Sequence, residues 1–529
     1  MGYIEVANLA YAIPGGRTLF QDVSFRIGDR QHVALVGPNG AGKTTIMRLL
    51  SGEEAAQTGT VRVDGRVGYM RQFIGAPDHP MTVRDLLIST ASLEVQKADR
   101  TRADAEAAAA RSNDTAVQNR YAEAVVAWSG IGGYDLEVEW DVCTIAALSL
   151  SYAAVADRSV DTLSGGEQKR LALEALFRSE ADVLLLDEPD NFLDIPGKRW
   201  LEETFQRSQK TIFYISHDRA LLANTSRRVV TLEARGSWTH EGSFASYQEA
   251  RAARLLKIEG EQRRFRERRD QLEASLREMK RRAAMNSKFA SRAKSAETKL
   301  RRYERDHTPR ERPAEQDIKM DLGGGRTGKI AFRAKKLAIP GIVDPFDTEI
   351  HFGERIGVVG GNGTGKSHFL KLLGGEDIAH DGEWKLGARV EPSLFTQLHH
   401  RPDLEGKDLV DILGARGFQR GGAMSLLKRY ELSQSAQTPF RLLSGGQQAR
   451  FQLLIMESQS PTMLLLDEPT DNLDVASAEA LEEALIHYRG TVIAVTHDRW
   501  FMLLLDRFLV FEEDGRVHEA LESPYLQSA

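Results

Sequence analysis

The sequence predicts an α/β protein in which two domains of the same kind are joined by an antiparallel helical hairpin. The first observation behind this prediction is an internal repeat: four motifs occur twice, in the same order, along the 529 residues. The second is an alternation of short apolar runs with helical stretches in each copy, which is typical of a largely parallel sheet covered by helices. The third is a basic, helix-patterned segment between the copies.

Composition excludes several classes of protein. Hydrophobic residues make up 41% of the chain and charged residues 28%, as in a globular protein. Cys143 is the only cysteine, so neither an internal disulfide nor a cysteine-rich zinc site can form. The N-terminus has no signal-peptide pattern, and no stretch reaches the roughly 20 apolar residues that a membrane span needs. We therefore expect a cytoplasmic protein.

The repeated motifs define the two domains. VALVGPNGAGKT at 33–44 returns as IGVVGGNGTGKS at 356–367, and LSGGEQ at 163–168 returns as LSGGQQ at 443–448. VLLLDEPDNFLD at 183–194 returns as MLLLDEPTDNLD at 463–474, and YISHD at 214–218 as AVTHD at 494–498. The first domain is placed at 1–248 and the second at 323–529. The first copy also contains an insertion of about 45 residues, rich in alanine, which predicts a helical arm at about 85–135.

The segment 249–322 is predicted to be the basic helical hairpin. Between 250 and 312 the chain holds 21 Lys and Arg against 10 Asp and Glu, although the whole chain has a net charge of -6. Apolar residues with heptad spacing lie on either side of a turn-prone Met285-Asn286-Ser287, and Pro309 and Pro313 end the second helix. A first helix of roughly 35 residues would extend about 50 Å. Because positive charge is the main source of affinity for the phosphates of a nucleic acid such as RNA, three residues near its tip are candidates for such a contact: Lys288, Arg292 and Lys294.

Both copies contain the P-loop pattern, two glycines with four residues between them, followed by Lys and then Thr or Ser. Such a loop wraps a phosphate chain in backbone N–H groups at a helix N-terminus, where the helix dipole favours anions. Lys43 and Lys366 are expected to reach the β- and γ-phosphates, while Thr44 and Ser367 coordinate Mg²⁺. A third match, at Gly323, lacks the Ser or Thr and a preceding strand, so it is interpreted as a linker. The phosphate-binding candidates are Gly37, Asn39, Gly40, Gly42, Lys43, Thr44 and Thr45 in the first copy and Gly360, Asn362, Gly363, Gly365, Lys366 and Ser367 in the second.

Acidic residues at strand ends complete the predicted chemistry. Asp187 and Asp467 each end an apolar run, where a carboxylate can hold Mg²⁺. Glu188 and Glu468 follow and are placed to polarise an attacking water as general bases. A single such acid could be a surface residue, but its occurrence in both copies disfavours that explanation. His217 and His497 are expected to sense the γ-phosphate, and Gln72 and Gln397 are weaker candidates for the nucleotide site.

LSGGE or LSGGQ upstream of LLLDEP resembles the signature of ATP-binding cassettes, so two P-loop NTPase domains of this type are expected. In that family two cassettes pair head to tail, and the signature of each covers the ATP of the other. The signature residues are Ser164, Gly165 and Gly166 in the first copy and Ser444, Gly445 and Gly446 in the second. Two cassettes on one chain, without membrane segments and with a basic helical linker, resemble the ABC-F family. The resemblance implies a Mg²⁺-dependent ATPase that binds ribosomes and extends its linker toward tRNA and rRNA, here as a monomer with intramolecular cassette pairing.

Some residues depart from the family pattern. The first copy has Asp190 and Phe192 where the family usually has Thr and His. Tyr11 is placed to stack on adenine in the first copy, whereas the equivalent stretch of the second copy, LAIPGIVDP, contains no aromatic residue. His368 also stands where the first copy has Thr45. The sequence thus predicts tighter ATP binding by the first copy.

Other functions remain open at this level. The chain could be the ATPase subunit of a transporter whose membrane subunits are separate proteins, and the basic segment could be a solvated helix face. A DNA-repair ATPase usually inserts zinc modules or long coiled coils within a cassette, and a non-hydrolysing scaffold would not need both glutamates. Within the ABC-F interpretation, a translation factor and an antibiotic-resistance protein are not separated by sequence, although the short hairpin tip favours the former.

Overall fold

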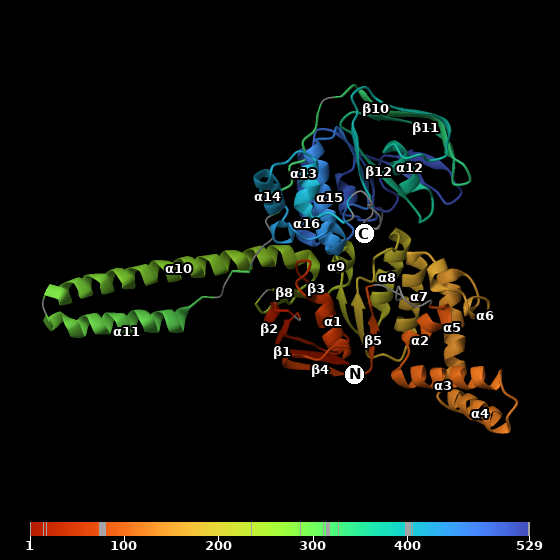
Figure 1. Ribbon diagram of the computed structural model, residues 1–529, viewed down its shortest axis with the longest axis horizontal. Helices are drawn as coiled ribbons and strands as arrows, with labels where there is room; N and C mark the ends of the chain where they lie inside the picture. Colours follow the sequence, from red (N-terminus) through yellow and green to blue (C-terminus); the bar gives the residue numbers. More distant parts are fainter. Residues whose placement is uncertain are drawn as a thin grey trace.

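The computed structural model describes residues 2–13, 15–16, 18–72, 81–233, 235–285, 287–309, 312–313, 318–325, 327–396, 404 and 406–526. Two α/β units, the first and second cassettes, lie against each other, and a long helical hairpin extends to one side from the junction between them (Figure 1). The two cassettes have the same sheet topology. The repeat seen in the sequence is therefore a repeat of structure.

The first cassette is built on a six-stranded sheet with the order β5-β6-β7-β3-β8-β9. All neighbouring strands are parallel except β8 and β9. An antiparallel sheet with the order β2-β1-β4 packs beside it. Every residue of β3, β6 and β7 is buried, as expected of central strands covered on both faces. The strands are β1 (Tyr3–Ala12), β2 (Thr18–Ile27), β3 (His32–Val36), β4 (Thr58–Asp64), β5 (Val67–Met70), β6 (Val183–Asp187), β7 (Thr211–Ile215), β8 (Arg228–Leu232) and β9 (Ser237–His240).

The second cassette repeats this arrangement. Its six-stranded sheet has the order β14-β15-β16-β12-β17-β18 and its antiparallel sheet the order β11-β10-β13. The region of the third P-loop match lies before β10 and contains no strand among its described residues. The strands are β10 (Ile330–Ile339), β11 (Val343–His351), β12 (Arg355–Gly360), β13 (Asp381–Leu386), β14 (Pro392–Phe395), β15 (Met463–Asp467), β16 (Thr491–Val495), β17 (Arg507–Phe511) and β18 (Val517–Ala520).

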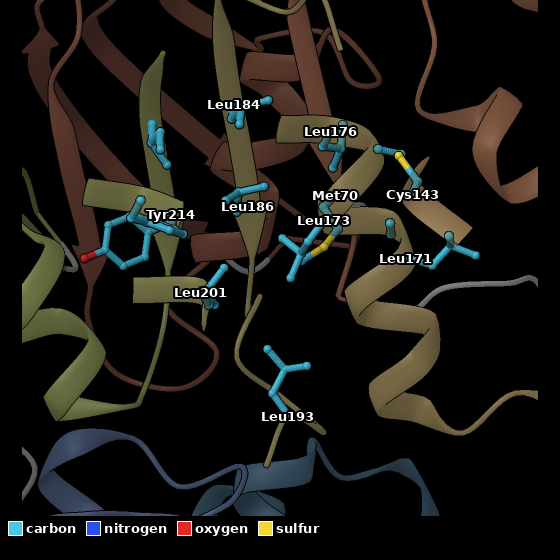
Figure 2. Packing of buried hydrophobic residues seen from close by; sticks show 14 of the residues in the cluster. Met70, Cys143, Leu171, Leu173, Leu176, Leu184, Leu186, Leu193, Leu201 and Tyr214 are labelled. Carbon is cyan, nitrogen blue, oxygen red and sulfur yellow. The ribbon is translucent and has the colours of Figure 1, made fainter. Parts of the chain in front are cut away.

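Helices cover the large sheets and create the main cores. Figure 2 shows Leu184 and Leu186 of β6 facing Leu173 and Leu176, which lie on a helix that packs across the sheet. Burying one such leucine contributes about 1.5–3 kcal/mol. The helices involved are α1 (Lys43–Ser51), α7 (Gly165–Arg178), α8 (Ile195–Arg207) and α9 (Arg219–Thr225) in the first cassette and α12 (Lys366–Leu373), α15 (Gly445–Gln459) and α16 (Val475–His487) in the second.

Five helices lie between residues 83 and 155, a longer interval than the 85–135 predicted to hold the helical arm. Two of them, α3 and α4, pack against each other at the far edge of the first cassette (Figure 1). The same interval of the second cassette has only two α-helices among its described residues, α13 (Leu409–Ala415) and α14 (Arg420–Arg429). Within the described parts of the chain, no helix is long and apolar enough to cross a membrane. The five helices are α2 (Val83–Ser89), α3 (Leu93–Ala109), α4 (Thr115–Gly130), α5 (Gly133–Leu148) and α6 (Tyr152–Val155).

The hairpin consists of α10 (Phe244–Met285), a short 3₁₀ turn at Ser287–Phe289, and α11 (Ala290–His307). With 42 residues, α10 is longer than expected and extends about 63 Å. The heptad residues form the seam between the two helices: Leu272 and Ala293 are buried, and the rings of Phe265 and Tyr303 stack at 5.2 Å. α10 starts before residue 249 because Phe244 and Tyr247 are buried in the first cassette.

Candidate active sites between the two cassettes

The two phosphate loops lie between a central strand and a helix. In each loop the residue before the lysine is a glycine with left-handed backbone geometry, φ 98° at Gly42 and φ 94° at Gly365. A Cβ at Gly42 would come within 2.9 Å of the Phe20 ring, and one at Gly365 within 2.8 Å of Val343. Only glycine fits these two positions. The loops can therefore turn sharply and present backbone N–H groups at the N-termini of α1 and α12.

The P-loop lysines are held inside their loops. Lys43 Nζ donates a hydrogen bond to the Gly37 carbonyl at 2.8 Å, and Lys366 Nζ donates to the Gly360 carbonyl at 2.9 Å. Burial lowers the pKa of both ammonium groups, and nearby acidic residues oppose that shift. A buried cation next to a ring of backbone donors is a site for polyphosphate.

The strand-end aspartates suit a divalent cation. Asp187 is fully buried beside Thr44, the other predicted Mg²⁺ ligand of the first site. In the second cassette Ser367 Oγ donates to Asp467 Oδ1 at 3.2 Å, so the two predicted Mg²⁺ ligands are adjacent. Burial raises the pKa of both aspartates. Buried carboxylate oxygens beside a hydroxyl group fit a hard cation such as Mg²⁺.

In the first site, Glu188 is held by two side-chain amides. Gln72 Nε2 donates to Glu188 Oε2 at 2.7 Å, and Asn191 Nδ2 donates to the same oxygen at 2.5 Å. His217 Nε2 lies 3.9 Å from the other carboxylate oxygen. Burial and then Asp187 raise the pKa of Glu188, while burial lowers the pKa of His217 to about 3. The structure thus brings the predicted base, glutamine and histidine of this site together.

In the second site, Glu468 is held differently. The backbone N–H of His497 donates to Glu468 Oε2 at 2.9 Å, and His497 Nε2 lies 3.4 Å from Glu468 Oε1. Burial, followed by the charges of Asp471 and Asp467, raises the pKa of Glu468 to about 8. Gln397, the predicted partner from the neighbouring strand, lies outside the described residues. Both glutamates have left-handed backbone angles, φ 51° at Glu188 and φ 48° at Glu468, a strained geometry that is common at functional sites.

The two cassettes meet head to tail across these sites. Asn39 of the first P-loop donates from its side chain to the Asn472 carbonyl at 2.9 Å and from its backbone to Asp474 at 3.0 Å. In the opposite direction, Asn362 of the second P-loop donates to the Phe192 carbonyl at 3.2 Å. The first P-loop therefore faces the second cassette, and the second P-loop faces the first.

The signature serines begin the helices that face the opposite P-loop. Ser164 starts α7 with a capping box to Glu167, and Ser444 starts α15 with a capping box to Gln447. The second P-loop and the first signature enclose a cavity of about 370 Å³, which also contains Asp467, Glu468 and His497. Its lining includes the signature residues Ser164, Gly165 and Gly166 and the P-loop residues Asn362, Gly363, Gly365, Lys366 and Ser367. A cavity of this size and polarity can hold a nucleotide.

The residues that depart from the family pattern all lie at or beside these sites. Phe192 is 40% exposed in the 370 Å³ cavity, next to Gly165. Asp190 is buried nearby, and burial together with Asp218 raises its pKa to about 6. Tyr11 is half-buried on β1, with its ring 6.2 Å from that of Phe20. The side chain of His368 also lines the cavity.

The predicted RNA contacts lie far from the nucleotide sites. Lys288, Arg292 and Lys294 belong to the tip of the hairpin, at the 3₁₀ turn and the start of α11. Arg292 is exposed there, and its guanidinium group lies 5.4 Å from the Phe289 ring.

Sequence reasoning missed the residues that tie the cassettes together. Arg219 and Arg499, each directly after a His-Asp pair, form ion pairs with Glu482 and Glu202 of the opposite cassette. Lys198 lies buried in the same interface. Each arginine occupies the same place in its copy, so comparing the copies beyond the four motifs would have identified them.

Comparisons with known proteins agree with this geometry. Residues 20–191 and 343–471 match the family model described as ABC transporter. An antibiotic resistance protein of Mycobacteroides abscessus is 46% identical and covers 99% of this chain and 100% of its own length. ABC transporter F family member 5 of Arabidopsis thaliana is 30% identical over 94% of this chain and 73% of its own. The energy-dependent translational throttle protein EttA of Mycobacterium tuberculosis is 26% identical over 92% of this chain and 87% of its own.

A solved structure shows the same fold. The archaeal ribosome recycling factor aABCE1, crystallised with the ribosomal stalk protein aP1, superposes with a TM-score of 0.57 at 19% identity, covering 96% of this chain and 89% of its own.

Proposed function

The chain belongs to the ABC-F family of ATP-binding cassette proteins, and from that membership we propose that it binds the ribosome and uses ATP-driven closure to position its hairpin. In this proposal the tip of the hairpin contacts rRNA or tRNA and thereby modulates translation. The protein works as a monomer, because both cassettes needed for head-to-tail pairing are on one chain.

The observation that carries the proposal is the hairpin itself. It is basic, it is stiffened by its own apolar seam, and its tip stands away from both cassettes (Figure 1). Its root contacts both of them: Tyr247 of α10 is buried on the first cassette, and Gln248 of α10 donates a hydrogen bond to Glu479 of α16. A change in the relative position of the cassettes therefore moves the tip. Positive charge on such a lever suits a phosphate backbone.

The catalytic part of the proposal assigns a role to each group. The P-loops and Lys43 or Lys366 bind the phosphates, and the signature serine of the opposite cassette covers the γ-phosphate. Thr44 with Asp187, and Ser367 with Asp467, would hold Mg²⁺, which when bound offsets the negative charge on the β- and γ-phosphates. Glu188 and Glu468 accept a proton from the attacking water. Burial lowers the pKa of His217 and His497, so both are neutral where they contact the γ-phosphate.

Ribosome binding can be tested directly with a variant that closes but does not hydrolyse ATP. Glu188→Gln with Glu468→Gln should co-sediment with ribosomes in the presence of ATP and much less with ADP. The transporter alternative predicts instead that the protein is recovered with membranes from cell lysates. Recovery with membranes, and no ATP-dependent recovery with ribosomes, would reject the proposal.

Protection against ribosome-targeting antibiotics is a second candidate function. It is favoured by the 46% identity, over nearly the whole of both chains, with a protein named for antibiotic resistance. The discriminating experiment is a susceptibility panel on cells with and without the gene. A higher inhibitory concentration of one class of ribosome inhibitors in cells with the gene would establish protection. Unchanged susceptibility to every class would reject protection and keep the translation role as the proposed function.

A further inference from the structure

The two candidate active sites differ at the third residue after the proposed base. In the first site this residue is Asn191, whose amide donates to the Glu188 carboxylate. In the second site it is Asp471, which raises the pKa of Glu468 by its negative charge. An ionised carboxylate has no proton to donate. The second site therefore places a repelling acid where the first site has a supporting amide.

The two sites also differ in what the opposite cassette supplies. Position 198 on α8 of the first cassette is lysine, and the equivalent position on α16 of the second cassette, 478, is alanine. Lys198 is 7% exposed, and its Nζ lies 2.9 Å from Asp218 Oδ2. The same ammonium group donates to the His497 carbonyl of the second cassette at 3.4 Å, in a buried contact. Lys198 thus reaches the histidine whose N–H holds Glu468.

Most of the charged residues around Lys198 are acidic, and they belong to both cassettes. Asp218, Asp190 and Asp471 all act on the ammonium group and raise its pKa, which keeps it charged despite burial. In return, Lys198 offsets the repulsion that Asp471 and Asp467 exert on Glu468. The charged groups facing this cluster also include Lys366, Asp498, Arg219, Arg499 and Glu202.

We propose that Lys198 is a positioning residue for the second active site, supplied by the first cassette. It holds the main chain at His497 and balances the charge of Asp471, so that Glu468 is kept in place beside the attacking water. The role exists only when the cassettes are closed, which makes hydrolysis at the second site depend on the first cassette. This inference rests on the proposed role of Glu468 as a base.

The internal repeat shows that the third residue after the base and the residue opposite it differ together between the two sites. The first site combines Asn191 with an opposing Ala478, and the second combines Asp471 with an opposing Lys198. In the first combination neither residue is charged, and in the second the lysine offsets the charge of the acid. An acid opposite an uncharged residue would instead be a buried carboxylate without its cation. The free-energy cost of that arrangement is far larger than the cost of replacing both partners together.

The test measures each site separately. ATP turnover in the Glu188→Gln background reports the second site, and turnover in the Glu468→Gln background reports the first. Lys198→Met keeps most of the side-chain stem and removes the charge. It should lower kcat at the second site by about tenfold or more with little change in KM, because the charge acts on the base rather than on ATP binding. In the Glu468→Gln background its effect should stay within about twofold, which also shows that the variant folds and closes.

Rescue separates positioning from general stability. Adding Asp471→Asn to Lys198→Met recreates the arrangement of the first site, and should restore kcat at the second site to within about threefold of its background. Equal losses at both sites, a loss confined to KM, or no rescue by Asp471→Asn would overturn the proposal. If Lys198→Met alone does not fold, the Lys198→Met, Asp471→Asn variant is the test: its kcat at the second site should still lie within about threefold of its background. The outcome is distinct from a failure of the base assignment, which the Glu188→Gln, Glu468→Gln variant would reveal by retaining turnover.

Discussion

Arg219 of the first cassette and Glu482 of the second form an ion pair across the cassette interface, with Arg219 Nη1 2.9 Å from Glu482 Oε2. The repeat places a matching pair in the opposite direction, between Arg499 and Glu202. The Arg219 side chain is 2% exposed and also contacts Asp498 at 3.3 Å. Because each arginine follows a His-Asp pair directly, the interface joins the histidine of one active site to a helix of the other cassette.

The first prediction is that these pairs stabilise the closed state. Arg219→Met leaves Glu482 without its partner and should weaken ATP-driven closure, measured as the apparent ATP affinity of the Glu188→Gln, Glu468→Gln protein. Glu482→Gln should weaken it as well, and the double variant should lose less than the sum, with a coupling energy of about 1–3 kcal/mol. Additive effects would show that the ion pair contributes no free energy to closure.

The second prediction concerns hydrolysis. Replacing both Glu188 and Glu468 by glutamine should preserve ATP binding and reduce turnover by about 10²–10⁴-fold, the usual contribution of a positioned general base. The closed protein should then persist on ribosomes and slow growth when expressed. Single variants serve as controls, since each leaves one base in place. Turnover close to that of the unmodified protein in the double variant would contradict the assignment.

Much of this architecture can be predicted because it depends on local patterns. Gly42 before Lys43, apolar runs ending at Asp187, and heptad spacing around Leu272 each specify a local geometry that the fold preserves. The first residue of α10 is harder to predict from such patterns. Phe244 and Tyr247 have no distinctive spacing, and their role becomes clear only from the surface of the first cassette against which they are buried.

The side-chain pairings across the interface cannot be predicted from such local patterns. Nothing near Lys198 in the sequence indicates that its partners are Asp218 in the same cassette and His497 in the other. In the sequence Asp190 is only a departure from the family pattern, and its meaning becomes clear when Lys198 and Asp471 are seen to surround it. Contacts between residues so far apart along the chain follow from how the cassettes dock, which no local spacing encodes.

The third prediction is an asymmetry in ATP affinity. Tyr11 offers a ring on β1 for adenine, whereas its region in the second cassette contains Ile339 and no aromatic residue. Base–aromatic stacking contributes about 1–3 kcal/mol, so Tyr11→Ala should weaken ATP binding at the first site by about tenfold or more. The measurement is a nucleotide titration in the Lys366→Ala background, and Tyr11→Phe, which keeps the ring, is the control. An equal loss in both variants would assign the effect to the hydroxyl group instead.

The fourth prediction is a pH dependence of the second site. Burial, Asp471 and Asp467 raise the pKa of Glu468 to about 8, so below that pH most of the carboxyl group is protonated and cannot accept a proton. Turnover in the Glu188→Gln background should therefore rise with pH through about 8. Burial holds the pKa of His497 well below its ordinary value, so His497 stays neutral over this range and adds no second inflection.

A further variant tests whether Glu468 is the group whose titration causes this pH dependence. Asp471→Asn removes one of the two negative charges acting on Glu468 and should shift the rising limb of the kcat profile to lower pH. A profile that is flat between about pH 6 and about 9, or one that Asp471→Asn does not move, would rule out Glu468 as the titrating group.

The last prediction concerns the hairpin tip. Changing Lys288, Arg292 and Lys294 to glutamate reverses three charges that lie in no nucleotide motif, so ATPase activity without ribosomes should be nearly unchanged. Ribosome affinity should fall, because the variant tip binds fewer phosphates and so releases fewer counterions. The dependence of affinity on salt should weaken by about 0.7–0.9 of a log–log slope unit for each phosphate that is no longer bound. Stimulation of ATPase activity by ribosomes should fall in parallel.

The matched control places the same charge reversal nearer the cassettes. Arg263, Arg264 and Arg266 lie on α10 well before the tip, and their change to glutamate alters the net charge of the protein by the same amount. If affinity depends on phosphate binding at the tip, the tip variant should bind ribosomes far more weakly than this control at every salt concentration. Equal reductions in the two variants would mean that overall charge, not the reach of the hairpin, drives binding. A tip variant that binds like the unmodified protein would reduce the hairpin to a spacer between the cassettes.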